Sequence, residues 1–181
     1  INQPDSLYIT YTLTNFNGYN VSCFGGDNAT VDVQINGGTA SFTHYFNGGV
    51  ITNNLIQNLG AGTYIDSIVD AKGCISTETI TLTEPSQILA TPTITNVSCN
   101  GLNDGSITIN SSGGTGSHIY SINGGAFQAS NDSAGLAAGS YTINVKDSNN
   151  CILTDNVTIS EPSSLSPNFT STDVSCFGMS D

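Results

Sequence analysis

The chain repeats one short stretch, Val21-Ser22-Cys23-Phe24-Gly25, and this repetition decides the fold. The stretch returns as Val97-Ser98-Cys99-Asn100-Gly101 after 76 residues and as Val174-Ser175-Cys176-Phe177-Gly178 after a further 77. Other landmarks recur in the same order at nearly the same step: Leu59-Gly60-Ala61-Gly62-Thr63-Tyr64 with Leu136-Ala137-Ala138-Gly139-Ser140-Tyr141, Asp70 with Asp147, Cys74 with Cys151, and Thr83-Glu84-Pro85-Ser86 with Ser160-Glu161-Pro162-Ser163. Self-similarity at a fixed period predicts a tandem array of small structural units.

The recurring Glu-Pro pair marks where one copy ends and the next begins. We expect residues 1–4 to be the tail of a preceding repeat, residues 5–85 to form repeat domain 1, and residues 86–162 to form repeat domain 2. Residues 163–181 are then the start of a third, truncated repeat. The first copy is longer because it carries a short insertion within residues 9–18. Since the pattern is cut at both ends, we expect the chain to be a fragment of a longer array.

Apolar and polar residues alternate within each copy, as they do in strands with one buried face. Val31, Val33 and Ile35 alternate with Asp32 and Gln34. Gly-Gly turns and an Asn-Gly-Gly hairpin signal separate such runs. The chain is rich in Thr, which favours strands, and in Asn and Gly, which favour turns. We predict an all-β fold of tandem small immunoglobulin-like β-sandwich domains, each of about six to seven antiparallel strands.

Each copy also has a tyrosine directly after a glycine turn, Tyr64 in the first and Tyr141 in the second. This placement resembles a tyrosine corner, in which the hydroxyl binds the backbone of the turn that leads into a late strand. An ordinary core tyrosine after a turn is the alternative, and the sequence is equally compatible with both.

The charge of the chain excludes several kinds of partner. There are 14 acidic residues and only two basic ones, Lys72 and Lys146, for a net charge of −12. Nucleic acids and anionic membrane surfaces are bound through Lys and Arg, so neither is an expected partner. No apolar run approaches the length that spans a bilayer, so we do not expect membrane insertion.

The five cysteines favour an oxidising, extracellular compartment. We predict one disulfide within each complete copy, Cys23–Cys74 and Cys99–Cys151. Closing loops of this length would stabilise each domain by about 4 kcal/mol. Cys176 is left over because its copy is cut short. Zinc is not expected, because the chain has no C-x-x-C pair.

This pairing depends on how many strands lie within residues 50–59. A single strand there would bring the two cysteines of one copy to the same end of the sandwich. A single strand there would also put both termini of a copy at the same end of the sandwich, an arrangement that does not suit a straight rod. Bonds between copies, Cys74–Cys99 and Cys151–Cys176, therefore stay open as the alternative.

Neither histidine belongs to a recognisable catalytic set. His44 and His118 are not equivalent in the repeat, and each occupies a strand position where the other copy has an aromatic residue. We interpret both as half-buried structural rings. Asp66 stands in the register of Ile143, so it either lies near a strand end or departs from the inward pattern. No catalytic residue and no enzymatic activity are expected, because no constellation of acid, base and nucleophile is present.

Acidic residues recur beside the turns: Asp70 and Asp147 before the second cysteine, and Glu84 and Glu161 before proline. We expect them to accept hydrogen bonds from nearby backbone N–H groups. A calcium site that stiffens a repeat junction is the alternative, although no EF-hand loop is present. No other cofactor is expected. Two aromatic residues that precede a glycine, Phe24 and Phe177, are expected to pack against their own loops.

Taken in order, these motifs resemble the SprB repeat of Bacteroidetes cell-surface proteins. The order is V-S-C-x-G, an Asn/Asp turn, G-G-T, an N-G-G hairpin, L-x-A-G-x-Y, D-x-x-x-C and E-P, in both complete copies. The resemblance implies a very large surface adhesin of gliding bacteria, exported by the type IX route. The chain departs from the family in lacking Trp and in having Asn149-Asn150 before Cys151.

We therefore expect a repetitive stalk or scaffold segment of a large cell-surface adhesin, involved in surface attachment and gliding motility. Its main partners would be the neighbouring repeats of the same chain. The alternative is a β-sandwich module that itself binds carbohydrate or another extracellular surface and is stiffened by calcium.

Overall fold

The structure, a computed structural model, describes residues 5–171 and Phe177. All regular elements in this part of the chain are β-strands, which form four antiparallel sheets. The described residues contain no helix of the length and hydropathy needed to span a membrane. The all-β prediction is confirmed.

Of the strands in the described residues, seven belong to the first copy and six to the second. The first copy contains β1 (Tyr8–Leu13), β2 (Ala29–Asn36), β3 (Thr43–Phe46), β4 (Gly49–Ile51), β5 (Leu55–Leu59), β6 (Gly62–Val69) and β7 (Ile75–Leu82). The second contains β8 (Leu89–Thr95), β9 (Gly105–Ser112), β10 (Ile119–Ile122), β11 (Asp132–Leu136), β12 (Gly139–Lys146) and β13 (Ile152–Ile159).

Each copy is a sandwich of two sheets. In the first copy β1-β2-β5 faces β4-β3-β6-β7, and in the second β8-β9-β11 faces β10-β12-β13. Corresponding strands take corresponding places, except that an isolated bridge between Tyr120 and Gln128 stands where β4 would be. In the first copy, the first, second and fifth strands share one sheet, and the third, sixth and seventh share the other. Immunoglobulin-like sandwiches have the same arrangement.

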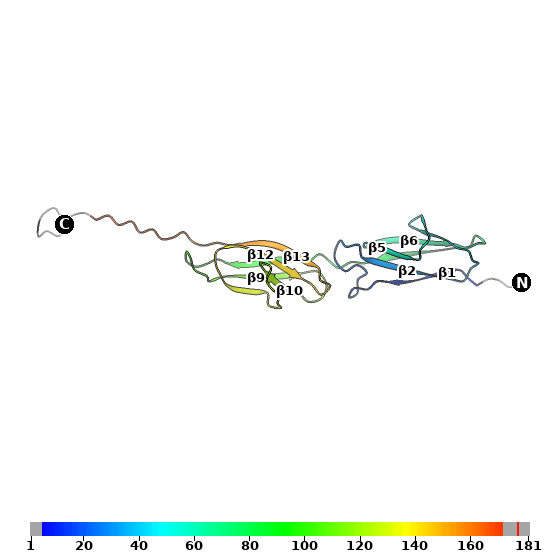
Figure 1. The fold of residues 1–181 in the computed structure, drawn as a ribbon, viewed down its shortest axis with the longest axis horizontal. Coiled ribbons are helices and arrows are strands. Elements are labelled where there is room, and N and C mark those ends of the chain that lie inside the picture. The colour runs from blue at the N-terminus through cyan, green and yellow to red at the C-terminus, as the bar shows by residue number, and fades with distance from the viewer. Residues whose placement is uncertain (1–4, 172–176, 178–181) are drawn as a thin grey trace.

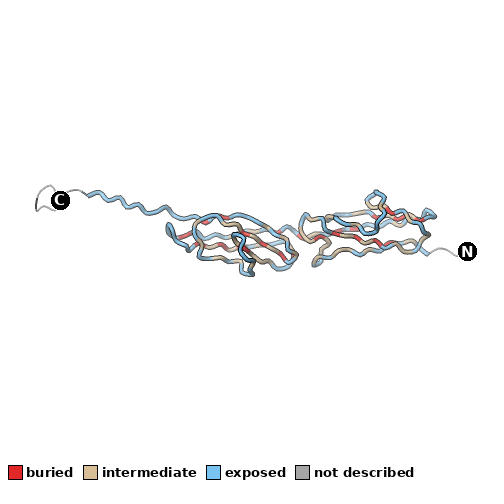
Figure 2. The backbone as a smooth tube through the Cα atoms, in the orientation of Figure 1, coloured by how far each residue is buried: buried red, intermediate tan, exposed pale blue. Residues whose placement is uncertain are grey.

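Separate apolar cores lie between the sheets of the two copies (Figure 2). The alternating residues of β2 and β9 supply the centres: Val31 and Val33 are fully buried in the first copy, and Ile107 and Ile109 in the second. Burying an aliphatic side chain of this size stabilises the fold by about 1.5–3 kcal/mol. Period-two patterning therefore produces one independent core in each copy.

Glycine is required where the chain turns after β2 and β9. Gly37 and its counterpart Gly113 both have positive φ, at 68° and 79°. A Cβ atom on Gly113 would also collide with the carbonyl oxygen of Gln87, and one on Gly37 with that of Ser6. The Gly-Gly-Thr turns predicted from the sequence thus bring the start of each copy against the end of its second strand.

The segment after the first hairpin contains two strands, where the disulfide prediction required one. β4 turns back along β3 after the Asn47-Gly48 turn, and β5 then runs antiparallel to β2. The chain thus crosses the sandwich one more time than that prediction assumed. As a result, Cys23 and Cys74 lie at opposite ends of the first copy, and so do the points where the chain begins and leaves it.

The two sandwiches stand end to end, and residues 163–171 continue in the same direction (Figure 1). We call the end of each sandwich where its chain begins the leading end, and the end where its chain leaves the trailing end. The leading end carries Cys74 in the first copy and Cys151 in the second. The trailing end carries Cys23 in the first and Cys99 in the second.

Candidate functional site at the repeat junction

One disulfide, Cys23–Cys151, joins the trailing end of the first copy to the leading end of the second. The Cα atoms are 5.7 Å apart, and 128 positions separate the two residues in the sequence. The predicted bonds Cys23–Cys74 and Cys99–Cys151 are therefore wrong, because the extra strand places the two cysteines of one copy at opposite ends. The alternative bonds between copies, Cys74–Cys99 and Cys151–Cys176, are also wrong.

The remaining thiols lie away from this junction. Cys74 and Cys99 are free and exposed. Cys176, predicted to be left over, lies outside the described residues.

Three side chains fix the loop that presents Cys23. Glu84 accepts a hydrogen bond from Gly25 N at 2.6 Å, and Asn20 Oδ1 accepts one from Thr83 N at 2.9 Å. Asn28 Oδ1 accepts another from Ser22 N at 3.0 Å. The second copy repeats all three bonds around Cys99, with Glu161, Asn96 and Asp104 as acceptors. The Glu of the Glu-Pro motif thus ties the cysteine loop to the end of the last strand.

An aspartate fixes each turn that presents a leading-end cysteine. Asp147 accepts backbone hydrogen bonds from Thr115, Asn149 and Cys151 at 2.8, 2.9 and 2.9 Å. Asp70 makes the same three bonds in the first copy, from Thr39, Lys72 and Cys74. These contacts confirm the turn interpretation of the two aspartates.

The charge state of Asp70 follows from this arrangement. Desolvation favours the neutral acid, but the backbone hydrogen bonds from Cys74, Thr39 and Lys72 outweigh it and lower the pKa of Asp70. Among the described residues, no group of three or more His, Cys, Asp or Glu side chains is placed to hold a metal ion.

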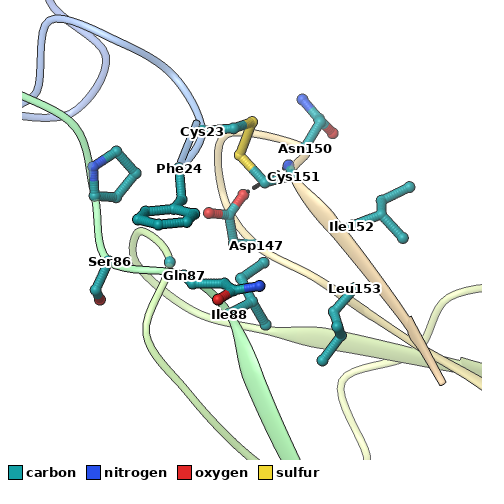
Figure 3. Close-up of a pocket in the computed structure, with 12 residues that line it drawn as sticks. Cys23, Phe24, Ser86, Gln87, Ile88, Asp147, Asn150, Cys151, Ile152 and Leu153 are labelled. Carbon is teal, nitrogen blue, oxygen red and sulfur yellow. Dashed lines mark hydrogen bonds between the residues drawn. A yellow bond between two sulfur atoms is a disulfide. The ribbon is translucent and has the colours of Figure 1, made fainter. Parts of the chain in front are cut away.

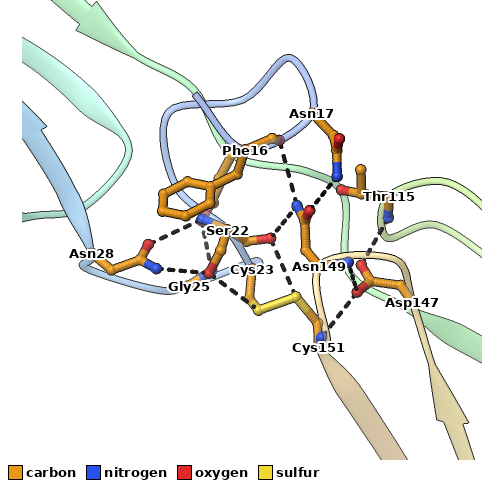
Figure 4. Close-up of a disulfide and its surroundings, with 11 residues drawn as sticks. Phe16, Asn17, Ser22, Cys23, Gly25, Asn28, Thr115, Asp147, Asn149 and Cys151 are labelled. Atoms are coloured by element: carbon orange, nitrogen blue, oxygen red, sulfur yellow. Dashed lines mark hydrogen bonds between the residues drawn. A yellow bond between two sulfur atoms is a disulfide. The ribbon is translucent and has the colours of Figure 1, made fainter. Parts of the chain in front are cut away.

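The Asn149 side chain connects the two copies beside the disulfide (Figure 4). Its Nδ2 donates to Ser22 O at 3.0 Å and to Phe16 O at 3.4 Å, while its Oδ1 accepts from Asn17 Nδ2 at 2.6 Å. Phe16 and Asn17 belong to the insertion found only in the first copy. The insertion therefore supplies contacts that are particular to this junction.

A groove with a volume of about 440 Å³ runs across the junction (Figure 3). The first copy contributes Cys23, Phe24 and Pro85. The second contributes residues 86–88, which precede β8, and residues 150–153 at the start of β13, together with Gly114 and Asp147. Phe24 is 54 % exposed and lines this groove together with residues of the second copy. Phe177 is also exposed, so the expected packing of these two rings against their own loops is not found. The Cys151 sulfur lies 3.2 Å from Ser22 O, a close contact in which no hydrogen is shared because a disulfide sulfur carries no proton.

The first core contains a buried polar pair that the sequence did not predict. His44 Nε2 lies 2.6 Å from Asp66 Oδ1, and both side chains are buried. Asp66 therefore departs from the apolar inward pattern, and His44 is more deeply buried than expected. Burial, and then the negative charge of Asp66, raise the pKa of the nearby Tyr11 hydroxyl.

Three further residues that the sequence singled out have structural roles. His118 is half-buried as expected, with Ser111 Oγ 2.7 Å from its Nδ1 and Gly113 O 3.1 Å from its Nε2. The tyrosine corner is formed in both copies, because Tyr64 donates to Gly60 O at 3.0 Å and Tyr141 donates to Ala137 O at 2.9 Å.

The SprB repeat matches residues 19–50 and residues 91–127. The matched segments contain the cysteine loop and the strands that follow it in each copy, so the resemblance read from the motifs is confirmed. SprB repeats are found in cell-surface proteins, and a disulfide suits an oxidising extracellular setting. No curated protein matches the chain.

Proposed function

We propose that these repeats are a stalk segment of a cell-surface adhesin that acts in surface attachment and gliding motility. In this role the repeats hold a distal binding region away from the cell and do not themselves carry out chemistry. The observation that carries the proposal is the junction, where a covalent bond and the Asn149 hydrogen bonds hold two sandwiches end to end.

Two further features support a structural role. The bonds that fix the cysteine loop and the leading-end turn are the same in both copies, as expected for modules selected to join to one another. The histidines also support it: His44 is buried against Asp66, and His118 is bonded to a serine and a backbone carbonyl.

The spacer role can be tested by small-angle scattering on the 181-residue chain. We expect the oxidised protein to scatter as an extended rod, and Cys23→Ser/Cys151→Ser to give a wider distribution of shapes with a smaller mean dimension. Cys74→Ser/Cys99→Ser is the matched control and should leave the profile unchanged. Equal profiles for all three proteins would contradict a junction held straight by the disulfide.

A glycan array and polysaccharide sedimentation test the competing role. A stalk segment should show no saturable binding. Saturable binding of a glycan by the isolated chain would replace the spacer proposal with a carbohydrate-binding module.

A further inference from the structure

The two halves of the junction occur again, without partners, at the outer ends of the described repeats. Cys99 stands at the trailing end of the second copy on a loop fixed by the same three bonds that fix Cys23. Cys74 stands at the leading end of the first copy on the same Asp-capped turn as Cys151. Cys23 and Cys151 are partly buried by each other's repeats, whereas Cys74 and Cys99 are exposed.

The surface around Cys99 matches the first-copy half of the junction groove. A hollow at this end is lined by Cys99, Asn100 and Pro162, the counterparts of Cys23, Phe24 and Pro85. Ser98 and residues 163–165 complete its lining, and residues 163–165 are the counterparts of residues 86–88. Pro85 is fully buried at the junction, while the equivalent Pro162 is exposed. Leu165 is 97 % exposed, although its counterpart Ile88 is only 6 % exposed in the second core. At the junction the second sandwich buries Pro85 and Ile88, and the counterparts Pro162 and Leu165 are the residues that a third sandwich would bury.

The surface around Cys74 matches the second-copy half of the groove. Its hollow is lined by Leu7, Gly38, Asp70 and Cys74 among others, the counterparts of Ile88, Gly114, Asp147 and Cys151. Lys72 takes the position of Asn149 in the first copy. Its ammonium group is a hydrogen-bond donor that can bind a loop carbonyl of a preceding repeat, as the Asn149 side chain binds Ser22 O.

We propose that the leading end around Cys74 and the trailing end around Cys99 are docking surfaces for neighbouring SprB repeats. In each joint the trailing-end cysteine of one repeat bonds the leading-end cysteine of the next. Cys99 then pairs with the leading-end cysteine of a following repeat, and Cys74 with the trailing-end cysteine of a preceding one. This inference concerns the joints alone and does not depend on the adhesin role.

The bond formation is an oxidation that requires an electron acceptor. Two thiols lose two protons and two electrons, and a disulfide oxidant such as oxidised glutathione takes them up to give two thiols. The thiolate of one cysteine first forms a mixed disulfide with glutathione, and the thiolate of the other cysteine then attacks the protein sulfur of that bond and releases the glutathione thiolate.

A head-to-tail duplicate of the two repeats tests the pairing. Each copy has its own core, and all strand pairings among the described residues lie within one copy, so residues 5–162 contain two complete folding units. Two such segments are joined directly from Pro162 to Asp5, because Asp5 and Ser86 make the same hydrogen bond, accepted from Gly38 N and Gly114 N respectively. The protein is refolded in a glutathione buffer, alkylated and mapped by non-reducing peptide mass spectrometry.

We expect Cys99 of the first segment to be bonded to Cys74 of the second, beside a Cys23–Cys151 bond in each. The outermost Cys74 and Cys99 should be the only alkylated cysteines. In the matched variant, Cys99→Ser in the first segment alone, the inner Cys74 should become alkylated while both Cys23–Cys151 bonds persist. The proposal is overturned if no Cys74–Cys99 bond forms while both Cys23–Cys151 bonds do. It is also overturned if a Cys74–Cys99 bond persists in the Cys99→Ser variant, because that bond would not join the two segments as proposed.

Discussion

Removing the junction disulfide should destabilise each repeat separately, although the bond lies between them. While the first repeat is folded, Cys23 stays beside the start of the second. If the second repeat unfolds alone, its chain is therefore still a loop of about 65 residues that the disulfide closes. A cross-link of that loop length raises the free energy of unfolding by about 4 kcal/mol. The same holds for the first repeat while the second is folded.

The loop is longer when both repeats unfold, but the gain is small. With 128 positions between the cysteines, the chain-entropy relation gives about 5 kcal/mol for the pair. The bond therefore raises the free energy of a state with one repeat unfolded almost as much as it raises the free energy of the state with both unfolded. It should make the two repeats unfold together, and the cysteine variant should lose that cooperativity.

Guanidinium unfolding of Cys23→Ser/Cys151→Ser measures this effect. Far-UV circular dichroism and tyrosine fluorescence are suitable signals, because the chain has seven Tyr and no Trp. With a slope of about 2–3 kcal/mol/M for each domain, and so about 4–6 kcal/mol/M for two domains that unfold together, a loss of about 5 kcal/mol lowers the midpoint by about 1 M.

Cys74→Ser/Cys99→Ser removes two exposed thiols as a control and should change the stability by less than about 0.5 kcal/mol. Equal midpoints for the two double variants would refute the reasoning.

Three other perturbations test the interior and the turns. Asp66→Ala should cost about 3–5 kcal/mol, because it leaves His44 buried without its partner, whereas Asp66→Ile/His44→Tyr, which copies the second repeat, should stay within about 1 kcal/mol of wild type or exceed it. Denaturant midpoints compare the two, and a double variant as unstable as the single one would contradict this account. Tyr64→Phe and Tyr141→Phe should each cost about 1 kcal/mol in thermal unfolding, since each loses one hydrogen bond to a backbone carbonyl, and unchanged transitions would rule out a contribution from the corner. The lowered pKa of Asp70 means that its stabilisation is complete above about pH 4 and is lost as the pH falls through the folded-state pKa, so Asp70→Asn should flatten the acid limb of a stability–pH curve. An equally steep acid limb in Asp70→Asn would exclude that role.

The sandwich was predictable because its signals are local. Alternation in β2, the Asn47-Gly48 hairpin and the glycine turn before Tyr64 each depend on a few neighbouring residues, and both copies repeat them. The disulfide was not predictable, because it depended on recognising β4, a strand of three residues, Gly49–Ile51, whose first two are exposed. So short a strand has no alternating pattern, and missing it reverses the end at which Cys74 lies.

The buried pair and the junction contacts were missed for a different reason. His44 and Asp66 depart from the apolar pattern in the same copy and on adjacent strands, β3 and β6, so comparison of the two copies contained a signal for a pair. Asn149 differs, because it acts through the insertion of the other copy. A contact of that kind depends on how two folded units meet, and no local pattern within either unit encodes it.

The offset pairing of Cys23 with Cys151 also sets how far the protein can be pulled apart. A tensile load applied at Asp5 and Pro162 passes from Cys23 directly to Cys151, so the residues between them, 128 positions in sequence, carry none of it. Only about 30 residues outside the bond can lengthen. At about 3.5 Å per stretched residue, the residues between the two cysteines would otherwise add some 450 Å to the extended length. The segment should therefore behave under load as a nearly inextensible tether, even when both sandwiches have lost their fold.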